Sequence, residues 1–165
     1  DVDMCFGADF VEKLLSRIGP ETFVESRTKY WKIRLARKIY SGEIDPFTDP
    51  DLCMGGRTKK RTTAGGCQCA HIDQWEKVRG FDEEFVGWGS EDFDLLTRMK
   101  RSGAKVSWMG EGNDQVSLFH QPHHKPDVKG DLACQEVNKK ILHKSMRGER
   151  SYTANPNGWG GIYIV

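Results

Sequence analysis

Glycine divides this chain into short segments, and that punctuation constrains the fold more than any other feature. Of the 165 residues, 18 are glycine, above the usual share of roughly 7%. Many of them stand in doublets or short motifs: Gly55-Gly56, Gly65-Gly66, Gly87-Trp88-Gly89 and Gly158-Trp159-Gly160-Gly161. Because glycine marks turns and close backbone approaches, we expect short helices and strands between these motifs. The sequence predicts a single α/β domain over residues 1–165.

The residue patterns between the glycine motifs set the expected boundaries of these elements. Residues 23–40 show both helical and strand periods, and we favour a helix there. Residues 42–61 are expected to form a surface loop. The other expected helices cover residues 9–18, 71–78, 91–101 and 132–146, and the expected strands cover residues 67–70, 104–109 and 115–120.

Overall composition argues against several classes of protein. Lys and Arg number 25 against 24 Asp and Glu, so the net charge of +1 argues against a whole-chain reader of nucleic acid or anionic membrane. We therefore expect no nucleic-acid partner. No apolar run reaches the roughly 18 residues of a membrane span, so we also expect no transmembrane segment. The five scattered cysteines are unlike a disulfide framework. We expect a reducing, cytoplasmic compartment, with peripheral membrane association of a parent protein left open.

Charge is nevertheless segregated along the chain. Residues 27–38 and 57–61 carry only basic charges, whereas residues 82–94 hold six acids and no base. The basic stretches could bind phosphate or an anionic polymer, although a run of charge is usually a solvated face. The acidic stretch is the more informative of the two because it opens a predicted helix.

Asp92 is the candidate functional residue of that helix, which Ser90 is expected to cap. It heads an apolar stripe whose other members follow at i+3, i+4 and i+7, namely Leu95, Leu96 and Met99. A carboxylate at the inner edge of a helix loses solvation unless it is paired, bound to a ligand or reactive. The opposite face of this helix carries four charged residues, namely Glu91, Asp94, Arg98 and Arg101. Opposite charges four residues apart on a helix can pair. A favourable interaction with the helix dipole is enough to explain Asp94.

Two further clusters suggest a metal site. Asp1 and Asp3 would lie on one face of an extended strand, about 7 Å apart, and suit a hard divalent cation. Three histidines crowd near the other end of the chain, at His120, His123 and His124. Imidazole together with carboxylate favours a metal such as manganese over calcium. Solvated terminal acids and a metal-free surface histidine cluster remain the alternatives.

A third cluster is formed by Cys67, Cys69 and His71, which alternate along a predicted strand. The spacing could imitate a soft-metal site. Such sites usually need a second pair of ligands elsewhere in the chain, and this sequence has no such pair. Buried cysteines also behave as small apolar residues. We therefore favour a structural role for Cys67 and Cys69.

In order along the chain, these features resemble one family. The resemblance is carried by Gly65-Gly66, Trp75, Gly80-Phe81-Asp82-Glu83-Glu84-Phe85 and Gly87-Trp88-Gly89-Ser90-Glu91-Asp92-Phe93-Asp94-Leu95. The sequence resembles the C-terminal catalytic segment of metal-dependent GT-A glycosyltransferases, of the family-two and β-1,4-galactosyltransferase type. This resemblance extends from Asp1 to about His124, and its most specific motifs lie in residues 65–95.

The resemblance implies a GT-A fold with a mixed sheet flanked by helices. The family's N-terminal nucleotide-binding half precedes the Asp-x-Asp motif, and we expect it to be absent here, since this chain begins at Asp1. The isolated chain is then expected to bind nucleotide poorly and to be inactive alone. Some relatives carry a second metal ligand three residues before the metal-binding histidine. This chain has Ser117 at that position, so that second ligand is in doubt here.

The resemblance also implies an activity and a role for each site residue. The enzyme would invert configuration and move a hexose or N-acetylhexosamine from a nucleoside-diphosphate sugar, a UDP-sugar, to a carbohydrate hydroxyl with Mn²⁺ or Mg²⁺. Asp92 would be the catalytic base, with Glu91 and Trp88 binding the acceptor. The donor would be held by Asp1, Gly65, Gly66 and Gly87, and the metal by Asp3 and His120.

Two other classes of function fit parts of the sequence. One is a non-catalytic carbohydrate-binding module derived from the same fold. The other is a metal-dependent hydrolase that uses Asp1, Asp3 and the histidines, which leaves Gly87-Trp88-Gly89 without a role.

Overall fold

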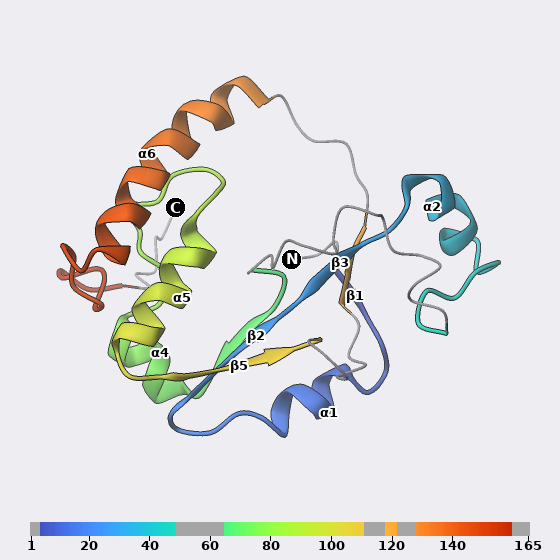
Figure 1. Cartoon of the computed structure of the whole chain (residues 1–165), viewed down its shortest axis with the longest axis horizontal. Coiled ribbons are helices and arrows are strands. Elements are labelled where there is room, and N and C mark those ends of the chain that lie inside the picture. Colours follow the sequence, from blue (N-terminus) through green and yellow to red (C-terminus); the bar gives the residue numbers. More distant parts are fainter. Residues whose placement is uncertain (1–3, 49–64, 111–117, 122–127, 160–165) are drawn as a thin grey trace, which may run out of the picture. The chain divides into compact units, whose positions relative to one another are not determined.

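The computed structural model describes residues 4–48, 65–110, 118–121 and 128–159. The chain divides into two compact units, and we describe each by itself. Unit 1 is drawn from Asp1–Ile18, Val24–Cys69 and Ser107–His124, and unit 2 from Gly19–Phe23, Ala70–Val106 and Lys125–Val165. The single domain over residues 1–165 stays a prediction. The described elements are both helices and strands (Figure 1), which makes the chain mixed α/β as expected.

Unit 1 contains a small mixed sheet. Its strands are β1 (Met4–Phe6), β6 (Leu118–His120) and β3 (Thr28–Tyr30), in the order β1-β6-β3. Strand β1 runs antiparallel to β6 and β3 runs parallel to it. Residues paired across neighbouring strands share a face of the sheet. The register therefore defines which side chains of β1, β6 and β3 lie together.

A second sheet has the order β4-β2-β5. Its strands are β4 (Gln68–Ala70), β2 (Thr22–Ser26) and β5 (Lys105–Met109). The side chains of β2 from Phe23 to Ser26 are all buried, as expected for a central strand covered on both faces. Strands at 67–70 and 104–109 were predicted within about one residue, and β6 matches the described end of the strand predicted at 115–120.

The preference for a helix across residues 23–40 is wrong for its first half. Residues Thr22–Ser26 and Thr28–Tyr30 form β2 and β3, and helix α2 covers only Ile33–Tyr40. Burial of this segment in two sheets decides between the two periods that the sequence contains. Helix α1 (Phe10–Leu15) is shorter than the predicted helix over 9–18.

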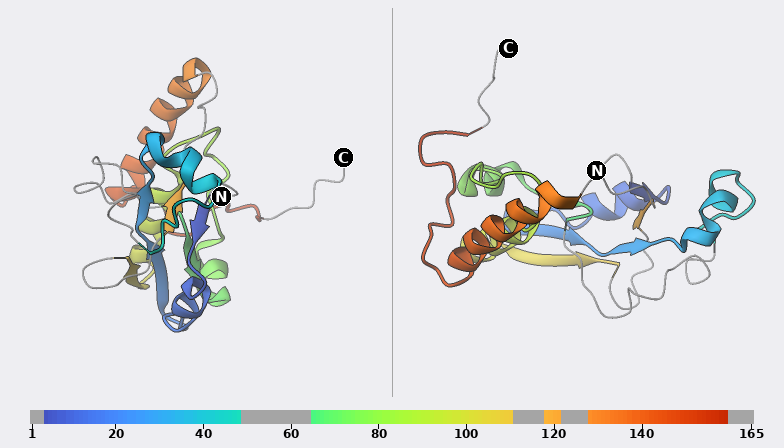
Figure 2. Two further views of the ribbon diagram at one scale, coloured as in Figure 1. Left: turned by 90° about the vertical axis from the view of Figure 1, so that its right-hand side faces the viewer. Right: turned by 90° about the horizontal axis from the view of Figure 1, so that it is seen from above.

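Unit 2 contains three described helices. They are α4 (Ile72–Val78), α5 (Glu91–Arg101) and α6 (Val128–Met146). Figures 1 and 2 show the C-terminal part of α6 beside α5, and the two helices are in contact. The helices at 71–78 and 91–101 were predicted almost to the residue, while α6 begins four residues before its expected start at residue 132.

The face that α6 turns inward differs from the expected one. The spacing of apolar residues predicts Val137 in the core, but its side chain is 55% exposed, whereas Asn138 and Ser145 are fully buried. Polar side chains therefore occupy inward positions of this helix, and hydrogen bonds of its side-chain amide to Val86 explain Asn138.

Two apolar clusters form the core of unit 1. The first is built on Phe10, Val24, Met109 and Leu118, with Met4, Leu14, Ile18, Cys67 and Cys69 packed against it. The second joins Trp31 and Phe119 to Cys5, Ile39, Ile44 and Phe47. The expected structural role of Cys67 and Cys69 agrees with their place beside the first cluster. None of the described helices is both long and apolar enough to cross a membrane.

Candidate functional site

The first group of predicted site residues lies in unit 1, at the end of strand β6. His120 pairs with Met4 of β1 on one side and with Tyr30 of β3 on the other. Its imidazole packs on the Tyr30 ring, with the ring centroids 5.1 Å apart. The three side chains therefore form one row on one face of the sheet.

Gly66 approaches the same face of this sheet. A Cβ atom at Gly66 would lie 1.9 Å from Oγ1 of Thr28 and 2.8 Å from the terminal methyl carbon of Met4. Thr28 stands two residues before Tyr30, so both point to one face of β3. Only glycine fits at this position. The structure thus brings Gly66, predicted to approach the donor, to the sheet face that carries His120, the predicted metal ligand.

Glu25, which is not among the residues predicted from the sequence, supports this glycine turn. The side chain is fully buried on β2. Its two carboxylate oxygens accept hydrogen bonds from the Gly65 backbone N–H, at 2.9 Å, and from the Gln68 side-chain amide, at 2.7 Å. A lone acid directly after two apolar residues, in Phe23-Val24-Glu25, was the available signal, because a buried carboxylate must be hydrogen-bonded.

Asp1 and Asp3 lie outside the described residues, as do His123 and His124. In the described part of the chain, no group of three His, Cys, Asp or Glu side chains is placed to hold a metal. Asp3 directly precedes Met4, the residue paired with His120. The strand register therefore sets His120 opposite the chain segment that continues from the Asp-x-Asp motif. An imidazole and carboxylates are a donor set that fits manganese or magnesium.

Cys67 is poorly suited to bind a soft metal. Burial raises the pKa of its thiol to about 11, and the neighbouring Cys69 and Glu25 add to the effect. The thiol is therefore protonated at neutral pH, whereas metals bind the thiolate. His71 has a local role instead, because its Nδ1 atom accepts a hydrogen bond from the Asp73 backbone N–H at the start of α4, at 3.4 Å.

The second group of predicted site residues lies in unit 2, where a tight turn leads into α5. Gly87, Gly89 and Ser90 have φ angles of 66°, 112° and 76°, and such a conformation is costly for serine. The side chain of Ser90 makes no capping hydrogen bond, contrary to expectation. Glu91 supplies a carboxylate instead, since its Oε2 atom accepts from the Gly89 backbone N–H at 2.7 Å. This bond fixes the Glu91 side chain against the turn.

The turn also rests on helix α6. The Asn138 side-chain amide accepts a hydrogen bond from Val86 N–H, at 3.3 Å, and donates one to Val86 C=O, at 3.1 Å. A Cβ atom at Gly87 would touch Cys134 at 3.4 Å, and one at Gly89 would come within 3.2 Å of Gln135. Both glycines therefore allow close packing on α6.

The side chain between these glycines points to solvent, since Trp88 is 60% exposed. An indole ring held at the tip of a turn that is anchored on both sides presents a large apolar surface to a ligand.

Asp92 occupies the second position of α5 and is half-buried. Burial raises the pKa of its carboxyl to about 6, and the neighbouring Glu91 carboxylate adds to the effect. A carboxylate with a pKa close to neutral is suited to accept a proton from a substrate. As expected from the stripe that it heads, Leu95, Leu96 and Met99 are buried.

Asp94 corrects one expectation. It is fully buried rather than solvated, and its Oδ2 atom lies 2.6 Å from Nε of Arg98, which is also buried. Arg98 donates a further hydrogen bond to Val78 C=O at the end of α4, at 3.0 Å. The predicted pairing of Asp94 with Arg98 is confirmed, but an interaction with the helix dipole does not describe it. The pair joins α5 to α4.

Comparison with protein families gives a match over residues 54–124, to the family described as the N-terminal domain of galactosyltransferase. This range contains Gly65, Gly66, Asp92 and His120. The match shows which family this segment resembles. Where the segment lies within a whole enzyme stays a prediction.

Several curated proteins are similar to the chain. β-1,4-Galactosyltransferase 3 of Homo sapiens is 44% identical over 89 residues, which are 54% of this chain and 21% of that protein. β-1,4-Galactosyltransferase 5 of Mus musculus is 36% identical over 94 residues, which are 55% of this chain and 24% of that protein. The chain thus matches less than a quarter of the length of each. No solved structure matches. We conclude that the chain carries a β-1,4-galactosyltransferase-like glycosyltransferase segment.

Proposed function

We propose that the protein containing this chain is a metal-dependent, inverting glycosyltransferase of the GT-A fold. It would move a hexose or N-acetylhexosamine from a nucleoside-diphosphate sugar, a UDP-sugar, to a hydroxyl of a carbohydrate acceptor. The observation that carries the proposal is Asp92. It lies inside the segment matched to galactosyltransferases, and burial raises the pKa of its carboxyl to about 6.

Asp92 acts as the general base in this proposal. Its carboxylate accepts the proton of the acceptor hydroxyl, whose oxygen then attacks the anomeric carbon of the donor from the side opposite the leaving diphosphate. This geometry gives inversion. Glu91, which the Gly89 N–H holds in place at 2.7 Å, orients the acceptor, and the exposed Trp88 ring packs on a sugar face.

The donor half of the proposal rests on unit 1. Gly65 and Gly66 are the residues whose backbone we assign to approach the donor, and Gly66 packs closely on Met4 and Thr28 of the sheet that carries His120. We assign Asp1 to donor binding too, and Gly87 of the turn before α5. Asp3 and His120 are the proposed ligands of Mn²⁺ or Mg²⁺. When bound, such a cation supplies positive charge that stabilises the departing diphosphate.

We also propose a reducing, cytoplasmic location. The described cysteines, Cys5, Cys67, Cys69 and Cys134, form no disulfide, in keeping with that compartment.

Transfer assays test the proposed activity. The protein containing this chain is incubated with a panel of nucleoside-diphosphate sugars and Mn²⁺, with and without carbohydrate acceptors. We expect a glycosylated acceptor only when donor, acceptor and metal are all present. Binding of acceptor without transfer from any donor would instead identify a carbohydrate-binding module. Release of sugar to water at the same rate with or without acceptor would identify a hydrolase.

A further inference from the structure

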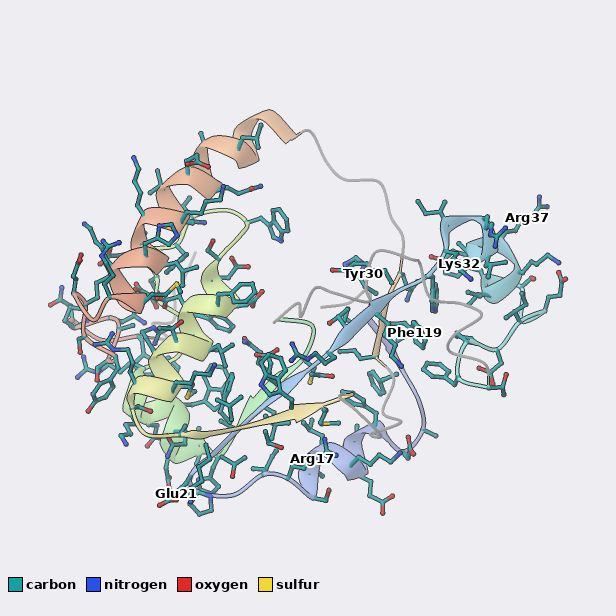
Figure 3. All side chains as sticks on the ribbon, in the orientation of Figure 1. Arg17, Glu21, Tyr30, Lys32, Arg37 and Phe119 are labelled. Carbon is teal, nitrogen blue, oxygen red and sulfur yellow. The ribbon has the colours of Figure 1, made fainter. Side chains whose placement is uncertain are left out.

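Helix α2 presents a basic face that the proposed function does not use. Arg34, Arg37 and Lys38 are exposed on this eight-residue helix. Figure 3 shows the Arg37 side chain directed away from the ribbon of α2. The opposite face packs inward, with Ile39 against the cluster of Trp31 and Phe119. The fold of unit 1 therefore fixes which side of α2 faces outward.

Apolar side chains are interleaved with these cations. Ile33 is 80% exposed, the most exposed large hydrophobic side chain in the described part of the chain, and Tyr40 is 57% exposed. Ile33, Arg37 and Tyr40 follow at i, i+4 and i+7 and form one ridge along the helix. Tyr40 lies at the edge of the outer face, because its ring also packs against the buried Trp31, with the ring centroids 5.8 Å apart. Ile33 thus places an exposed aliphatic side chain beside the exposed cation of Arg37.

The sequence that contains this ridge is basic. Between residues 27 and 38 there are six basic residues and no acidic one. Within α2 itself, Lys38 is partly neutralised, because its Nζ atom lies 2.7 Å from the Glu43 carboxylate. Arg34 and Arg37 remain the strongest sources of positive potential on the outer face of α2.

We propose that this outer face of α2 docks on an anionic lipid surface. Arginines would bind lipid phosphates, which they recognise through paired N–H groups. Ile33 would enter the boundary between headgroups and acyl chains, and the Tyr40 ring would lie at that boundary, where aromatic rings with one polar end are favoured. Clusters of basic residues on a helix beside apolar anchors are typical of such surfaces.

The exposed isoleucine favours lipid over a soluble anionic polymer. A polysaccharide or nucleic acid would use the arginines, but it offers no apolar layer for an aliphatic side chain. The near-neutral net charge of +1 does not oppose the proposal, because screening limits the field of each charge to about 8–10 Å at physiological salt. The local face, rather than the whole chain, meets the membrane.

Vesicle binding tests the proposal with the 165-residue chain. Sedimentation is measured with vesicles of phosphatidylcholine alone and with vesicles that contain about one-third phosphatidylglycerol. We expect binding only to the anionic vesicles, and loss of binding at high salt. The double variant Arg34→Gln, Arg37→Gln should bind about 25-fold more weakly, at about five-fold per charge. Ile33→Ser should bind several-fold more weakly at unchanged charge.

The matched control removes two exposed lysines of α6, Lys140→Gln and Lys144→Gln, which changes the net charge equally. We expect this variant to bind like the wild type. Circular dichroism confirms that each variant is folded. Equal loss in both double variants would show a non-specific charge effect and would overturn the proposal. So would equal binding to neutral vesicles, no vesicle binding at all, or binding only to a soluble polyanion such as dextran sulfate.

Discussion

Asn138 holds Val86 through both groups of its side-chain amide, with hydrogen bonds of 3.3 Å and 3.1 Å to the backbone N–H and C=O. One buried side chain of α6 thus satisfies the backbone just before the Gly87-Trp88-Gly89 turn. A polar residue at an inward position of a helix is stable only when it is paired in this way.

Replacement of Asn138 should loosen that turn. Asn138→Ala leaves both backbone groups of Val86 without this partner, and we expect the free energy of unfolding to fall by about 1–3 kcal/mol. The neighbouring Val137→Ala, on the exposed side of α6, should change it by no more than about 0.5 kcal/mol. Urea unfolding gives the free energies, and hydrogen exchange at the Val86 amide reports the turn itself. Equal effects of the two substitutions would contradict the role given to Asn138.

Breaking the buried Asp94–Arg98 pair should lower the free energy of unfolding more than breaking a surface ion pair. Asp94→Asn leaves the Arg98 charge buried without its partner, and we expect a loss of about 3–5 kcal/mol. The double variant Asp94→Leu, Arg98→Met should be less destabilised than Asp94→Asn, because it buries no charge.

Lys139→Ala serves as the control for this prediction, since it breaks the exposed pair with Glu136 on α6. Its cost should not exceed about 1 kcal/mol. Thermal or urea unfolding of the three variants checks the order. If Asp94→Asn cost no more than Lys139→Ala, the pair could not be the link between α5 and α4.

Gly66 should tolerate no side chain. In Gly66→Ala the new Cβ atom would meet Thr28 Oγ1 and the Met4 side chain, and we expect a loss of about 1–3 kcal/mol from overpacking. Gly19→Ala is the control, because its Cβ atom would meet only Thr22 Oγ1, at 3.6 Å. That variant should be neutral or slightly more stable. Similar stabilities of the two variants would argue against a close approach of Gly66 to the sheet.

Asp92 should lower stability at neutral pH. Its pKa in the folded chain, about 6, lies above the ordinary value of 3.8, so the folded state holds its proton more tightly. The stability that this proton contributes is complete below about pH 4 and is lost as the pH rises through about 6. After allowance for the partial exposure of the side chain, we expect Asp92→Asn to stabilise the chain by about 1–2 kcal/mol at pH 7.

That gain should shrink to almost nothing when unfolding is measured near pH 3.5, where the aspartate is protonated in the folded state and mostly protonated in the unfolded state. An advantage of Asp92→Asn that was the same at both pH values would mean that ionisation is not its cause.

The sequence predicted the parts of the structure that depend on local signals. Helix α5 was placed correctly because serine and glycine mark its ends and its apolar stripe is regular. The segment 23–40 was not, because Phe23, Val24 and Tyr30 fit a strand as well as a helix, and only long-range pairing decides between them.

The candidate site shows the same division. Asp92 could be singled out because its position on a helix conflicts with solvation. The hydrogen-bond partners of Glu25 and Asn138 could not be predicted, since they are the backbone groups of Gly65 and Val86, which lie 40 and 52 residues away. The capping role expected of Ser90 is wrong because the turn places this serine at a positive φ, and its side chain makes no capping hydrogen bond.

The most direct test of the central claim is the rate of sugar transfer by the Asp92→Asn variant. It is measured in the protein containing this chain, with Mn²⁺, a nucleoside-diphosphate sugar and a carbohydrate acceptor. Binding of donor and metal is measured separately by calorimetry. Asp73→Asn, at an exposed acid of α4, is the matched control. The account predicts that Asp92→Asn loses at least about 100-fold in turnover while binding donor and metal normally, and that Asp73→Asn keeps full activity. Near-normal turnover of Asp92→Asn would contradict it.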